Sequence, residues 1–177
     1  MNKGFVHIYT GNGKGKTTAA LGLAVRAAGA GMHVYIGQFI KSMEYHEIPM
    51  LRDRFPEITV DLYGIEGCII GRDPDGLDRK SALSGLEKAE NAISSSKYDL
   101  IILDEMTIAL YFCLISRDQV LHLLDLRQEK SPGTELVITG RYAPDYLLER
   151  ADLITEMKDV RHYYETQGIE ARDGIER

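Results

Sequence analysis

The chain has 177 residues, a length that suits one domain with a substantial hydrophobic core, and we predict a single domain over residues 1–177. Its 44% hydrophobic and 27% charged residues are typical of a soluble globular protein, and no apolar run approaches the length of a membrane span. The net charge of −6 argues against nucleic-acid binding, which favours a basic surface.

The beginning of the chain and its cysteines predict a cytoplasmic protein. The first expected strand starts within a few residues of Met1, so we expect no signal peptide. Cys68 and Cys113, the two cysteines, lie far apart and form no C-x-x-C pair, which favours reduced thiols and gives no sign of a zinc site. The five histidines show no metal-ligand spacing.

A glycine-rich loop between a strand and a helix is the first functional motif. Residues 5–9 (FVHIY) have strand character, residues 10–18 read TGNGKGKTT, and an alanine-rich helix is predicted over residues 16–28. In this order, the N–H groups of the loop, the positive end of the helix and a lysine can surround a polyphosphate. The pattern departs from G-x-x-x-x-G-K-[ST] because Thr10 stands at its first position. The predicted phosphate-binding residues are Gly11, Asn12, Gly13, Lys14, Gly15, Lys16, Thr17 and Thr18.

The following elements alternate between strands and helices. We predict strands over residues 33–38 and 59–63, a short helix over residues 48–54, and an amphipathic helix over residues 78–95. The connecting loop over residues 64–78 is long and contains several glycines, a feature of functional loops carried by a rigid scaffold.

A short apolar run at residues 100–103 (LIIL) predicts a buried central strand, which ends in Asp104 and Glu105. An acidic residue at the carboxyl end of such a strand lies beside a phosphate-binding loop, where it can hold Mg²⁺ directly or through water. The alternative is that the two acids cap a following helix. The predicted metal ligands are Thr17, Asp104 and Glu105.

The last third of the chain continues the alternation. Further elements are predicted at residues 117–128 (helix), 135–139 (strand), 144–150 (helix) and 153–157 (strand), before a polar tail at residues 159–177. This order predicts an α/β domain whose mainly parallel sheet is covered by helices on both faces. The carboxyl ends of its strands would bring the glycine-rich loop, the two acids and Arg141 together.

Five segments together resemble the P-loop class of ATP:corrinoid adenosyltransferases, which have a RecA-like core. The segments are TGNGKGKTTAALG at residues 10–22, GQFIK at 37–41, LDEMT at 103–107, VITGR at 137–141 and ITEMKDVRHYYETQGIEARDGIE at 154–176. The resemblance covers essentially the whole chain and implies a RecA-like P-loop domain.

Enzymes of this family move the 5′-deoxyadenosyl group of ATP to the Co(I) of a reduced corrinoid such as cob(I)alamin, and they release triphosphate. The resemblance therefore implies ATP, Mg²⁺ and a corrinoid as ligands. It implies Lys16, Thr17 and Glu105 as catalytic residues and Arg141 as a further nucleotide-binding residue. A homodimer and a reductase that supplies Co(I) are also implied.

The chain departs from the family at one loop, and two other functions remain open. Family members carry aromatic residues against the lower face of the corrin, whereas residues 65–70 read IEGCII and offer only isoleucines as an apolar floor. The first alternative is a P-loop ATPase or kinase that cuts between the β- and γ-phosphates of ATP. The second is a non-enzymatic, ATP-responsive protein that binds a corrinoid.

Overall fold

The computed structural model describes residues 3–41, 43–64 and 72–176 of the chain. The strands of the described part are β1 (Val6–Thr10), β2 (Val34–Phe39), β3 (Ile58–Tyr63), β4 (Leu100–Asp104), β5 (Glu135–Thr139) and β6 (Leu153–Glu156). The helices are α1 (Lys16–Gly29), α2 (Glu47–Arg54), α3 (Gly76–Ser94), α4 (Met106–Tyr111), α5 (Arg117–Lys130), α6 (Asp145–Leu148) and α7 (Tyr163–Gln167).

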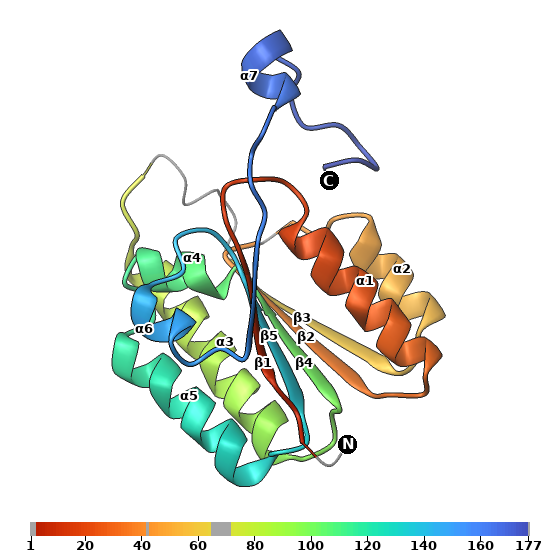
Figure 1. The fold of residues 1–177 in the computed structure, drawn as a ribbon, viewed down its shortest axis with the longest axis vertical. Helices are drawn as coiled ribbons and strands as arrows, with labels where there is room; N and C mark the ends of the chain where they lie inside the picture. Colours follow the sequence, from red (N-terminus) through yellow and green to blue (C-terminus); the bar gives the residue numbers. More distant parts are fainter. Residues whose placement is uncertain (1–2, 42, 65–71, 177) are drawn as a thin grey trace.

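All six strands form one parallel sheet in the order β3-β2-β4-β5-β1-β6. Helices α1 and α2 cover one face of this sheet, and α3 to α6 cover the other (Figure 1). The strands β2 and β4 are buried along their whole length, which explains the unbroken apolar run of β4 at residues 100–103. The structure therefore confirms the predicted α/β fold with a parallel sheet between two layers of helices.

The composition of α1 explains how closely it packs on the sheet. The small side chains of Ala20 and Ala24 are fully buried and those of Ala27 and Ala28 nearly so. They pack with apolar residues of β2, β4 and β5, including Ile36, in one of two clusters that make up the core. Because alanine has a short side chain, the helix backbone lies near the strands, and its N-terminus is held at their carboxyl edge.

Most predicted elements match the structure to within one or two residues at each end. The helix predicted to begin at residue 78 begins instead at Gly76, because Asp75 caps it and shares a reciprocal capping box with Asp78. Helices α4 and α7 were not predicted, since six and five residues are too few to show a helical repeat. None of the helices in the described ranges has the length and apolar character required to cross a bilayer.

Candidate active site

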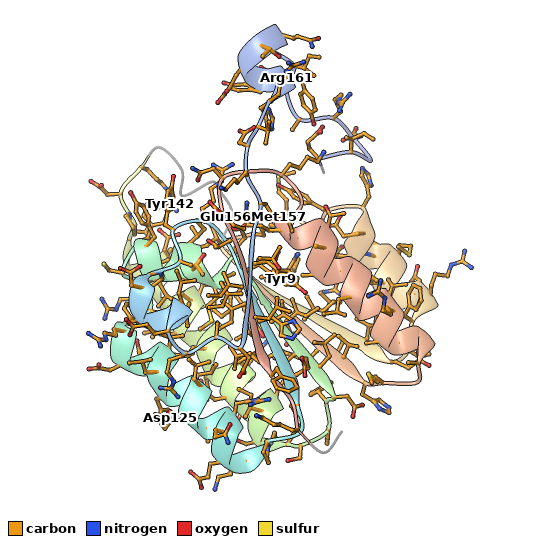
Figure 2. All side chains as sticks on the ribbon, viewed as in Figure 1. Tyr9, Asp125, Tyr142, Glu156, Met157 and Arg161 are labelled. Carbon is orange, nitrogen blue, oxygen red and sulfur yellow. The ribbon has the colours of Figure 1, made fainter. Side chains whose placement is uncertain are left out.

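The glycine-rich loop joins β1 to α1 at the carboxyl edge of the sheet. Gly11 and Gly15 have φ angles of 97° and 117°, in the region that favours glycine. The loop packs against the backbone that continues β6: the Gly13 N–H donates to the Met157 carbonyl at 2.7 Å, and the Met157 N–H donates to the Thr10 carbonyl at 2.8 Å. Figure 2 labels Met157 on this segment. These hydrogen bonds hold the loop on the side of the sheet where β6 lies.

Close approach of two backbones gives a second reason for glycine in the loop. A Cβ atom at Gly13 would lie 2.7 Å from the carbonyl carbon of Lys158, and one at Gly11 would collide with the Met157 carbonyl. The sequence motif was interpreted as a loop that turns its N–H groups toward an anion. In this structure the Gly13 N–H already donates to the Met157 carbonyl, so we expect an anion to bind the N–H groups nearer the start of α1.

Lys16 folds back over the loop. Its Nζ donates to the carbonyls of Gly11 and Gly13, both at 2.7 Å, and the residue is 7% exposed. Burial lowers the pKa of the Lys16 ammonium, and the carboxylates of Glu105 and Asp104 act in the opposite direction. The N–H groups of the first turn of α1 have no acceptor within their own helix. One buried ammonium and the start of α1 thus place positive charge at the loop, where it favours an anion.

Asp104 is the centre of the hydrogen-bond network. Its carboxylate is fully buried and accepts hydrogen bonds from four side chains: Thr17 Oγ1 (2.9 Å), Gln38 Nε2 (3.0 Å), Lys41 Nζ (2.8 Å) and Thr139 Oγ1 (2.6 Å). The four donors come from α1, β2, β5 and the turn after β2. This convergence confirms the predicted meeting of the loop with the acid at the end of β4.

Lys41 is the direct counter-ion of Asp104. Its Nζ also lies 3.2 Å from Thr17 Oγ1, so one ammonium touches an oxygen of two of the three predicted metal ligands, Thr17 and Asp104. Burial disfavours the charge on Lys41, but attraction and hydrogen bonding to Asp104 outweigh it, and the pKa of Lys41 is raised. Sequence reasoning gave Lys41 no role, although its place two residues after the end of a buried strand could have indicated one.

Glu105 and Arg141 lie on adjacent turns beside this network. Glu105 has a φ of 56°, and its N–H donates to Thr139 Oγ1 at 3.1 Å. Burial and the neighbouring Asp104 raise the pKa of the Glu105 carboxyl. The Arg141 carbonyl accepts a hydrogen bond from Thr107 Oγ1 at 2.6 Å. The charge of Glu105 raises the pKa of Lys16 and the charge of Arg141 lowers it, so these three predicted site residues lie in one region.

Lys14 points away from the other loop residues and toward the tail. Its Nζ bonds the Glu176 carboxylate at 2.6 Å and the Ile175 carbonyl at 2.9 Å. Tyr163 also bonds Glu176, and the Arg172 guanidinium lies over the Tyr163 ring, 4.9 Å from its centroid. The polar tail therefore folds back to the phosphate-binding loop, a contact that the sequence pattern did not predict.

The oxygen atoms at the end of β4 suit a hard divalent cation. In the described part of the chain, no group of three histidine, cysteine or acidic side chains is arranged to bind a metal. Mg²⁺ commonly keeps several waters and takes only one or two protein ligands, so Thr17 Oγ1 and an Asp104 oxygen are a sufficient donor set. The Lys41 ammonium lies beside both oxygens and supplies the positive charge at this position in the structure.

Comparison with known proteins identifies the family. Residues 2–177 match the family model of the ATP:corrinoid adenosyltransferases BtuR/CobO/CobP. A corrinoid adenosyltransferase of Sinorhizobium sp. is 34% identical over 175 residues, which cover 98% of this chain and 80% of that protein. The corrinoid adenosyltransferase of Escherichia coli K12 and the corrinoid adenosyltransferase CobA of Salmonella typhimurium are each 31% identical, with 98% of this chain and 86% of each relative covered. The chain therefore belongs to the family of ATP:corrinoid adenosyltransferases, which are transferases with ATP and a corrinoid as substrates.

Proposed function

We propose that the site around Thr17, Asp104 and Lys16 transfers the 5′-deoxyadenosyl group of ATP to the cobalt of a reduced corrinoid. A Co–C5′ bond forms with the electron pair of Co(I), the C5′–O bond breaks, and its electrons leave on the triphosphate. The observation that carries this proposal is the hydrogen bond between the Thr17 hydroxyl of the loop and the buried Asp104 carboxylate, in a chain of this family.

Stabilisation of the departing triphosphate is the task of the phosphate-binding residues. We propose that Gly15, Thr17 and Thr18 present N–H groups to phosphate oxygens, and that Lys16 Nζ exchanges its two loop carbonyls for phosphate. Negative charge on the triphosphate grows as the C5′–O bond breaks, so these donors act most strongly in the transition state. The proposed roles of Gly11, Asn12 and Gly13 are to shape the loop, and Arg141 adds positive charge at its edge.

Mg²⁺ is the proposed cofactor, held by Thr17 and Asp104 with Glu105 nearby. When bound, it supplies charge that offsets the triphosphate. Because the Lys41 ammonium lies against both Thr17 Oγ1 and Asp104, it must share these oxygens with the metal or move toward the phosphates. Attack by cobalt on carbon transfers no proton, so the raised pKa of Glu105 is not a sign of a general base in this scheme.

The products of the reaction test the proposal. Phosphorus NMR of a mixture of protein, ATP, Mg²⁺ and cob(I)alamin should show triphosphate that appears only when the corrinoid is present, together with the absorption spectrum of an adenosylated corrinoid. ADP and phosphate as the main products, with or without corrinoid, contradict it and favour the ATPase or kinase. ATP and corrinoid that bind without any product favour the non-enzymatic alternative.

A magnesium titration tests the metal assignment. Glu105→Ala and Asp104→Ala should each raise the Mg²⁺ concentration needed for half-maximal activity. Glu87→Ala, which removes an exposed glutamate of α3, is the matched control and should leave the titration unchanged. If both site variants follow the wild-type curve, neither acid contributes to Mg²⁺ binding.

The assembly and the partners are proposed from the family resemblance. We propose a cytoplasmic homodimer that receives Co(I) from a separate reductase. Light scattering should give about twice the chain mass of 19.9 kDa, and a value at the chain mass contradicts the dimer.

A further inference from the structure

Two exposed tyrosines stack on each other near the active site. Tyr111 ends α4, and Tyr142 lies in the turn that follows β5. Their ring centroids are 4.5 Å apart with an interplanar angle of 30°, and the two residues are 56% and 54% exposed. The rings of Phe112 and Tyr111 form an edge-to-face pair with a centroid distance of 5.3 Å. The result is an aromatic surface with much of its area open to solvent.

The stacked pair is fixed to the catalytic edge of the sheet. Thr107 lies one helical turn before Tyr111 on the same face of α4, and its hydroxyl donates to the carbonyl of Arg141, the residue before Tyr142. The Thr107–Arg141 hydrogen bond thus holds α4 to the turn after β5, and one helical turn later the rings of Tyr111 and Tyr142 are in contact. Tyr142 keeps a φ of 59°, a conformation that tyrosine rarely adopts, so its ring position depends on this surrounding geometry.

The pair lies within reach of the reacting groups. Tyr142 follows Thr139 by three residues, at most about 10 Å of chain, and Thr139 Oγ1 is bonded to Asp104. Figure 2 shows Tyr142 in the upper part of the molecule, toward the end at which the phosphate-binding loop and the start of α1 lie in Figure 1. Other exposed aromatic side chains are Phe5, at the amino end of β1, and Tyr164, in α7 of the tail.

We propose that Tyr111 and Tyr142 form a docking surface for the corrinoid substrate and contribute to its specificity. The inference rests on the transfer reaction proposed above and extends it to the second substrate. A corrin is a conjugated macrocycle with broad apolar faces and amide groups at its rim. The ring faces or edges of the tyrosines supply aromatic contact, and their hydroxyls can hydrogen-bond the amides. The phosphate-binding loop and Asp104, being charged and polar, provide no such surface.

The variants must remove each ring without straining the backbone. Tyr142→Asn is the first choice because asparagine tolerates a positive φ, and Tyr111→Ala is suitable because alanine has the highest helix propensity. Tyr142→Phe and Tyr111→Phe keep the rings and remove only the hydroxyls. Phe5→Ala, which deletes an exposed ring at the opposite edge of the sheet, is the matched control.

Both ring deletions should raise the KM for cob(I)alamin about fivefold to tenfold, while the KM for ATP changes by less than about twofold. The phenylalanine variants lose only the hydroxyl hydrogen bonds and should raise the corrinoid KM less than the ring deletions do, whereas Phe5→Ala should stay near wild type. Equilibrium dialysis of hydroxocobalamin with MgATP, without reductant, measures the same loss of affinity independently of turnover. It therefore tests the surface even if wild-type protein makes no adenosylated corrinoid, a result that would contradict the proposed reaction instead.

Three outcomes overturn the inference. The first is an unchanged corrinoid KM and affinity in both ring deletions. The second is an equal loss of affinity for ATP and for corrinoid together with a lowered melting temperature, which would show that the two tyrosines only stabilise the fold. The third is a change of mass in light scattering with both affinities intact, which assigns the pair to a contact between two copies of the chain.

Discussion

Replacing Asp104 by asparagine tests the central network most directly. Asparagine has the same shape but no charge, and one of its two polar atoms is an NH₂ donor. One carboxylate oxygen of Asp104 accepts from Thr17 and Thr139, and the other accepts from Gln38 and Lys41. On the Gln38 and Lys41 side its NH₂ would face an ammonium that can only donate, whereas on the threonine side it would meet hydroxyls that can accept. In both orientations the Lys41 ammonium loses its counter-ion.

The size of the effect follows from burial. Asp104 is fully buried and the Lys41 side chain is 16% exposed, so water cannot replace the lost partner well. Removing one member of a buried ion pair costs about 3–5 kcal/mol of unfolding free energy. For a protein of this size, the melting temperature should fall by about 6–20 °C.

Urea unfolding without nucleotide or Mg²⁺ measures this loss apart from catalysis. Lys41→Met should also destabilise the protein, because it leaves the Asp104 carboxylate buried with neutral donors only. The double variant should recover at least about 1 kcal/mol relative to the sum of the two single losses, since it removes both charges together. Asp125→Asn is the control: the Asp125–Arg150 pair has a similar distance of 2.5 Å but exposed partners, and its loss should cost less than about 1 kcal/mol.

Two results refute this reasoning. If Asp104→Asn unfolds within about 1 kcal/mol of wild type, the network does not stabilise the fold. If the two single losses simply add in the double variant, Lys41 and Asp104 are not energetically coupled, and Lys41 is not the counter-ion that the geometry indicates.

Three further predictions concern the loop, the turn after β5 and the tail. Lys16→Ala should abolish nearly all ATP use, as measured by turnover and by calorimetric ATP binding; near wild-type values contradict the assigned site. Gly140→Ala should lower stability by at least about 1–3 kcal/mol in thermal melts, because its φ is 133°, whereas Gly22→Ala in open space should not destabilise α1. Hydrogen bonds from Arg172 and then Lys14 hold the pKa of Glu176 well below 4.5. The contact of the tail with the loop should therefore be fully present above pH 4.5 and be lost as the pH falls through the lowered pKa of Glu176. Hydrogen exchange of the tail measures this loss, and Glu176→Gln should show it already at neutral pH.

Short local signals were sufficient to predict the strands and the loop. The run at residues 100–103 predicted a buried central strand, which the structure confirms, and the acid after it lies at the carboxyl edge of the sheet. Contacts between distant residues were not predictable in this way. Lys14 bonds Glu176 across 162 positions, and Met157 meets the loop across more than 140, through contacts that leave no periodic pattern. Residues 65–70, which lack the aromatic side chains of the family, lie outside the described residues, so the prediction of an apolar isoleucine floor there stays untested.

Strand order explains why the network around Asp104 could be predicted only in part. Any parallel α/β sheet brings the ends of its strands to one edge, so the meeting of Thr17 with the acids follows from the elements alone. Gln38 contacts Asp104 because β2 pairs with β4 in a register that sets these two residues side by side, and Thr139 reaches it because β5 is the other neighbour of β4. Strand β1 is not a neighbour of β4, so Thr17 must cross over β5, and it does so because α1 lies over both strands. The sequence thus predicts which residues reach the edge, while pairing and register decide which of them bond to Asp104.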